Sequence, residues 1–143
     1  MLLSHACLSN KIEEIQTIFQ TVESLQETLS VSPKTIFQLK LVIEEIFTNI
    51  ISYGYDNNRP NLVDLKISFE NERLGVEIVD DGRPFNPIEE APEPDLTASL
   101  EAKRVGGLGI HLLFTLMEDP AYHRIDGRNH LVFYKTLEKE PSA

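Results

Sequence analysis

The sequence is poor in cysteine and in positive charge. Cys7 is the only cysteine among 143 residues, which excludes an intramolecular disulfide and a cysteine-rich metal site. The 13 lysines and arginines stand against 23 aspartates and glutamates, giving a net charge of −10. This balance argues against broad binding to nucleic acid or to anionic membranes. A small anionic ligand stays open, because backbone N–H groups can hold phosphate without many lysines.

Long apolar runs are also absent. No stretch approaches the roughly 20 apolar residues of a transmembrane helix. The N-terminus MLLSHACLSNK has no basic start, so a signal peptide is not expected. The sequence shows no internal repeat and no low-complexity tract. We therefore expect a cytoplasmic protein with a single domain over residues 1–143, a length that suits one hydrophobic core.

Hydrophobic periodicity predicts an α+β domain. Strand-like patterns occur in five segments: 2–7, 62–70, 74–80, 122–126 and 130–137. Helical spacing occurs in three: about 11–29, about 34–52 and 106–118. A turn over 127–129 would join the last two strands, and 138–143 reads as a frayed tail. The order β-α-α-β-β-loop-α-β-β predicts a two-layer α/β sandwich, with helices on one face of a mixed, mostly antiparallel sheet.

The helix over 34–52 carries Glu45 and Asn49 at the border of its apolar stripe. At positions i and i+4 they project from the same helix face. Their oxygens could hold Mg²⁺, or the carboxylate could take a proton from a hydroxyl. From spacing alone, a plain polar edge is the favoured interpretation. Glu44 points roughly 100° away and is expected to be solvated.

A strand ends in Asp80-Asp81-Gly82. An aspartate in this position can accept a hydrogen bond from an exocyclic amine such as that of adenine. The glycine beside it would let a flat ring approach the backbone. A simple Asp-Gly turn is the alternative, and on this motif alone it is favoured.

Glycines 106, 107 and 109 precede and open a helix. Their N–H groups and the helix N-terminus would form a phosphate site, with Lys103 and Arg104 adding positive charge. A flexible hinge with a glycine-rich cap explains the cluster equally well. Between the two motifs, 82–106 is an unusually long loop, and such loops are usually functional or mobile.

The three motifs together are more specific than any one of them. In this order the chain resembles the Bergerat-fold ATPases, the GHKL group. EEIFTNIISYGY is similar to the N box, DDGRPFNP to the G1 box and GGLGIHLL to the G2 box. Within the group the chain resembles the anti-sigma-factor serine/threonine kinases, in its small size, its DDGRPFNP form and its GRNHLVFYK ending.

This resemblance implies a function and partners. The protein would be an ATP-dependent serine/threonine kinase that uses Mg²⁺, and also an anti-sigma factor. Its substrate would be a STAS-domain anti-sigma-factor antagonist, and its other partner a sigma factor. Dimerisation is common among the relatives, so a homodimer is a possible form of this protein. Direct contact with nucleic acid or membrane is not implied.

The resemblance also implies residue roles. Glu45 would be the general base, and Asn49 would bind Mg²⁺ and the nucleotide. Asp80 would contact the adenine amine, and Gly82 would allow close packing of the base. The segment 86–105 would be the ATP lid. The phosphate cradle would comprise Arg104, Gly106, Gly107, Leu108 and Gly109.

Some positions depart from the family pattern. Pro84 stands where many relatives have the second G1 glycine, and Tyr53 where many have histidine. The usual threonine of the last strand is not obvious, and Thr136 comes late. A second hypothesis is a non-catalytic, nucleotide-gated module that sequesters a protein partner. The presence of Glu45 argues against it, because a pure binder needs no base.

Overall fold

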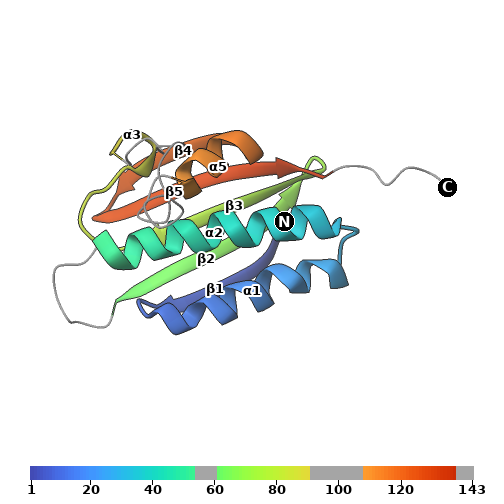
Figure 1. Cartoon of the computed structure of the whole chain (residues 1–143), viewed down its shortest axis with the longest axis horizontal. Helices are drawn as coiled ribbons and strands as arrows, with labels where there is room; N and C mark the ends of the chain where they lie inside the picture. The colour runs from blue at the N-terminus through green and yellow to red at the C-terminus, as the bar shows by residue number, and fades with distance from the viewer. Residues whose placement is uncertain (54–60, 91–107, 138–143) are drawn as a thin grey trace.

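The computed structural model describes residues 1–53, 61–90 and 108–137, and it shows helices packed on one face of a sheet (Figure 1). The sheet has five strands in the order β1-β2-β3-β5-β4. The strands are β1 Leu2–Ser9, β2 Leu62–Glu70, β3 Arg73–Asp80, β4 Glu118–Ile125 and β5 Arg128–Thr136. Within the described ranges every strand pairing is antiparallel. The predicted two-layer α+β sandwich with a mostly antiparallel sheet is confirmed.

The helices are α1 Ile15–Glu23, α2 Pro33–Tyr53, the short α3 Pro87–Glu90, and α5 Leu108–Leu116. Three of them follow the predicted order, and the short α3 lies in the segment 82–106 that was predicted to be a loop. The single helix predicted over 11–29 is instead α1 flanked by two 3-10 turns, Ile12–Glu14 and Ser24–Glu27. At its end the Ser24 hydroxyl donates to the Thr21 carbonyl at 2.7 Å, a local bond that competes with regular helix geometry.

Helix α2 begins as its sequence predicts. The Ser32 hydroxyl accepts a hydrogen bond from the Thr35 backbone N–H at 3.1 Å, and Pro33 takes the first helical position. Its apolar stripe is buried against the sheet, with Leu39, Val42, Ile43, Ile46 and Phe47 all at most 2% exposed. No helix of the described part is long and apolar enough to cross a bilayer.

Two tight hairpins, β2–β3 and β4–β5, supply four of the five strands. Asn71 and Glu72 join β2 to β3, while Asp126 and Gly127 join β4 to β5, and all four residues have positive φ. Positive φ at both loop residues is typical of two-residue hairpin turns. The turn predicted over 127–129 therefore starts one residue too late and ends two residues too late, because β5 already begins at Arg128.

The pairing of β3 with β5 joins these hairpins along one seam. In this register Asp80 lies opposite Asn129 at one end, and Arg73 lies opposite Thr136 at the other. β4 also begins at Glu118, four residues before the predicted 122–126, and α5 ends at Leu116 rather than at 118. The seam places the last residue of β3 beside the C-terminal end of α2, where the candidate site lies (Figure 1).

Candidate functional site

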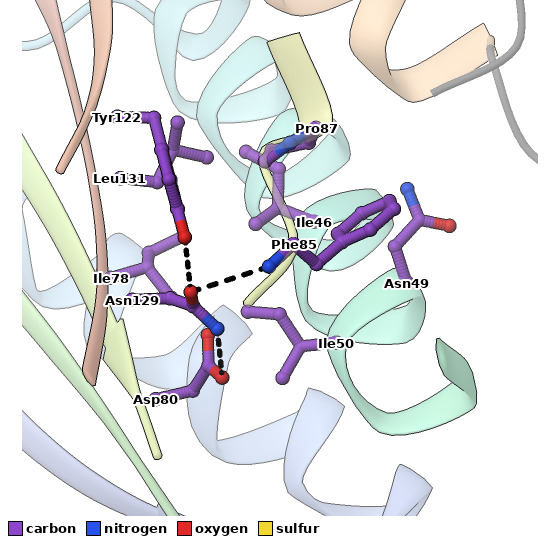
Figure 2. Close-up of a pocket in the computed structure, with 10 residues that line it drawn as sticks. All are labelled: Ile46, Asn49, Ile50, Ile78, Asp80, Phe85, Pro87, Tyr122, Asn129 and Leu131. Atoms are coloured by element: carbon purple, nitrogen blue, oxygen red, sulfur yellow. Dashed lines mark hydrogen bonds between the residues drawn. The ribbon is translucent and has the colours of Figure 1, made fainter. Parts of the chain in front are cut away.

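A pocket lies between α2 and the ends of β3 and β5 (Figure 2). Most of its wall is apolar, with a few polar groups, which is the usual make-up of a small-molecule site. Its lining residues are Ile46, Asn49, Ile50, Ile78, Asp80, Phe85, Pro87, Tyr122, Asn129 and Leu131. Asn49 and Asp80, which the sequence singled out separately, thus meet at one pocket.

Asp80 is a buried carboxylate, only 5% exposed. Its Oδ1 accepts hydrogen bonds from the Gly82 backbone N–H at 2.9 Å and from Asn129 Nδ2 at 3.0 Å. Burial raises the pKa of Asp80, while the bonds from Asn129 and Gly82 oppose that rise. Gly82 is itself buried, so the turn after β3 packs closely around the carboxylate.

Asn129 is the residue that sequence reasoning missed. Its amide Nδ2 donates to Asp80 and, at 2.9 Å, to the Arg83 carbonyl. Its Oδ1 accepts from the Tyr122 hydroxyl, from Arg124 Nη1 at 3.0 Å and from the Phe85 N–H at 3.4 Å. One amide therefore connects β3, β4, β5 and the segment after β3. The Asp126-Gly127 pair was the available signal, since a two-residue turn there places Asn129 inside the strand.

Thr136 does not take part in the pocket. It lies seven residues after Asn129 along β5, about 23 Å from Asn129 at the rise of an extended strand. Its hydroxyl donates instead to Glu118 at 2.8 Å. The sequence-based view that Thr136 comes too late is confirmed, and Asn129 occupies the position across from Asp80.

Glu45 lies one helical turn before Asn49 and is half-buried. Burial raises the pKa of Glu45, and the neighbouring charge of Glu44 raises it further. Glu44, expected to be solvated, is also partly buried. Glu45 is not among the described residues that line the pocket, so it stands beside the pocket rather than within it.

The predicted phosphate cradle lies mostly beyond the described ranges. Leu108 and Gly109 form the first turn of α5, whereas Arg104, Gly106 and Gly107 lie outside the described residues. Of the predicted lid over 86–105, only 86–90 are described, and they form α3 behind an Asn86 side chain that accepts the Ile88 N–H at 2.9 Å. The predicted tail 138–143 also lies outside, and the cradle and lid stay predictions.

Asn49 is the predicted ligand for Mg²⁺. Its side chain is 8% exposed and lies at the edge of the pocket beside Phe85 (Figure 2). Within the part of the chain that the structure describes, no three His, Cys, Asp or Glu side chains cluster to hold a metal. A single amide oxygen fits a Mg²⁺ that keeps several waters and binds mainly to phosphates.

Comparison with known proteins supplies a family and a set of relatives. A family model described as "Histidine kinase-like ATPase domain" matches residues 8–135. The serine/threonine-protein kinase BtrW of Bordetella bronchiseptica is 31% identical over 100 residues, 70% of this chain and 70% of that protein. The anti-sigma F factor of Bacillus subtilis is 29% identical over 99 residues, 69% of this chain and 67% of that protein. That of Thermoanaerobacter sp. is 29% identical over 68% of this chain and 66% of its own length.

Solved structures agree on the fold. A blue-light-activated histidine kinase from Erythrobacter litoralis matches with a TM-score of 0.56 at 16% identity, over 87% of this chain and 41% of that one. Its histidine kinase domain matches with a TM-score of 0.51 at 15% identity, over 88% of this chain and 60% of that one. With a family model that spans nearly the whole domain, the chain belongs to the histidine kinase-like ATPase (GHKL) family.

Proposed function

We propose that this protein is an ATP-dependent serine/threonine kinase that also acts as an anti-sigma factor in the cytoplasm. Membership of an ATPase family implies ATP binding. The observation that supports the proposal most is that one pocket brings Asn49 together with the buried Asp80–Asn129 pair. The names of the relatives, a serine/threonine kinase and anti-sigma F factors, support the choice of substrate and partners.

Asp80 would recognise the base. Both of its described hydrogen bonds end on Oδ1, and we assign Oδ2 to an exocyclic amine such as that of adenine. A buried carboxylate discriminates well, because a ligand that presents a carbonyl there would leave two acceptors facing each other. Gly82 would let the base lie against the backbone.

Asn49 would hold Mg²⁺ through its amide oxygen. When bound, the metal would neutralise charge on the phosphates. The glycines at 106, 107 and 109, with Leu108 and Arg104, would contact the phosphates at the start of α5. Phosphoryl transfer depends mainly on such alignment and charge neutralisation.

Glu45 would act as the general base. It would accept the proton of a serine or threonine hydroxyl as that oxygen bonds to the γ-phosphorus and the bond to the ADP oxygen breaks. Burial raises the pKa of Glu45, which makes its carboxylate a stronger base at neutral pH. Its place one turn from Asn49 would bring the hydroxyl close to the phosphates rather than to the adenine.

Phosphotransfer to a STAS-domain protein tests the proposal. The protein would be incubated with Mg-ATP and each STAS-domain protein of the same genome, and added phosphate would be located by mass spectrometry. We expect phosphoserine or phosphothreonine on one partner. Glu45→Gln should abolish transfer and spare ATP binding, whereas Glu44→Gln, which changes the adjacent acid, should keep transfer. Equal loss of transfer in both variants would contradict the role of Glu45.

A nucleotide-gated binding module is the second candidate. It is favoured by one observation, that the described pocket contains the base-recognition groups but not Glu45. In that case ATP would set the shape of the protein, and sequestration of a partner would be its work. ATP binding with no phosphate on any STAS-domain protein would support this second function over the first.

A further inference from the structure

The pocket is too small for a purine in the conformation described. The volume of the cavity is ≈ 20 Å³, roughly the room that one ordered water requires. A site for a whole small-molecule ligand typically occupies about 300 Å³ or more. Part of this wall must therefore move before a base can lie in this pocket, between α2 and Asp80.

Most of the wall is held in regular structure. Ile46 and Ile50 belong to the 21-residue helix α2, and Ile78 and Leu131 belong to the paired strands β3 and β5. Shifting any of these four side chains by the width of a ring would disturb helix or ladder hydrogen bonds and the core behind them. The wall on these two sides is rigid.

Phe85 lies on the movable side. It belongs to the irregular segment between β3 and α3, and in Figure 2 its ring points toward Asn49 of α2. This segment is anchored firmly at its start, where Arg124 donates to the Gly82 carbonyl at 2.8 Å and Asn129 to the Arg83 carbonyl at 2.9 Å. At Phe85 itself the bond from its N–H to Asn129 is 3.4 Å long, the weakest of the Asn129 contacts.

Tyr122 is the other aromatic side chain of the wall, but it is fixed more firmly. Its hydroxyl donates a short hydrogen bond to Asn129. Its backbone pairs with Leu131 in the ladder between β4 and β5. Of the two rings, Phe85 is therefore the one that can leave with the smaller loss of hydrogen bonds.

We propose that the Phe85 ring occupies the space of the base and must swing out before a purine binds beside Asp80. This inference rests on the proposed ATP binding. Asn129 then has two tasks, because the same amide orients the Asp80 carboxylate and holds the segment that carries the ring. The apparent affinity for the purine then equals the affinity of the open form multiplied by the fraction of molecules in which the pocket is open.

A tryptophan introduced at position 85 reports the movement directly. The natural chain contains no tryptophan, so Phe85→Trp gives a single fluorophore. On addition of ATP or adenosine we expect its emission to shift to the red as the ring enters water. The control is Phe37→Trp, at a position that is 64% exposed and twelve residues before Asn49 on α2, about 18 Å along the helix; its emission should not change.

Binding measured by calorimetry supplies the second test. Phe85→Ala should bind ATP and adenosine about tenfold more tightly than the natural protein, the gain expected if the open form is roughly 10% populated. Phe85→Leu keeps most of the bulk and should bind like the natural protein. Weaker binding by Phe85→Ala, or ATP binding by Phe85→Trp without a red shift of its emission, would overturn the inference while the proposed function stands. No binding of ATP by the natural protein would overturn both.

Discussion

Replacement of Asn129 by leucine, which has a similar size, removes the polar centre of the pocket. Asn129 and Asp80 are each 5% exposed, so water cannot easily replace the lost bonds. Asp80 Oδ1 loses one of its two donors, and the Tyr122 hydroxyl loses its acceptor. A buried polar group left without its partner costs about 1–3 kcal/mol. We expect Asn129→Leu to lower the free energy of unfolding by about 2–4 kcal/mol at pH 7.

The loss should depend on pH with a definite sign. Burial holds the pKa of Asp80 above its ordinary value of 3.8 in the folded protein, and the bond from Asn129 limits that rise. A carboxyl whose folded pKa is raised makes the fold less stable as pH rises from the unfolded pKa through the folded one. Without Asn129 the folded pKa rises further. The deficit of the variant should therefore be smallest near pH 4 and largest at neutral pH.

Urea unfolding at pH 4 and pH 7 measures both effects. The control is Thr136→Val, on the same strand, because Thr136 is exposed and its loss should cost no more than about 0.5 kcal/mol. A deficit for Asn129→Leu below about 1 kcal/mol would show that the amide network contributes little net stability. A deficit that grows toward acid pH would show that Asn129 does not act through the charged form of Asp80.

Two further predictions concern α2. The rate of phosphotransfer should rise with pH through a midpoint above 4.5, the ordinary pKa of glutamate, because burial and Glu44 raise the pKa of Glu45. Glu44→Gln should lower that midpoint. A pH profile that Glu44→Gln leaves unchanged would contradict the assignment of Glu45 as the base. Phe47→Ala should cost about 3–5 kcal/mol in urea unfolding, since Phe47 is 1% exposed, whereas Phe37→Ala on the same helix, at 64% exposed, should change stability by less than about 0.5 kcal/mol.

The sequence predicted the fold well because its signals there are local. The Ser32-Pro33 start of α2 and the alternation over 62–70 each arise from neighbouring residues, and both elements are found within a residue of their predicted bounds. The helix over 11–29 was predicted as continuous because apolar spacing does not reveal 3-10 turns, which keep much the same buried face.

The site was predicted only in part, because half of it depends on register. Asn49 and Asp80 stand in recognisable motifs, and the pocket brings them together. Phe85 lies within DDGRPFNP and Asn129 within GRNHLVFYK, but neither motif assigns a role to these two residues. Asn129 was predicted to lie in the turn, whereas β5 begins two residues earlier than predicted and places Asn129 in the strand opposite Asp80.

The seam between β3 and β5 ties ligand binding to the order of folding. Each of the two hairpins closes over a two-residue turn, whereas Asp80 and Asn129 are 49 residues apart in the chain. Local hairpins form before distant strands pair, so the pocket comes into existence only when the two hairpins dock. A ligand that binds there stabilises the docked form by about 2.7 kcal/mol at roughly a hundred times its dissociation constant. Amide hydrogens along the seam should then exchange with solvent more slowly than those within either hairpin turn.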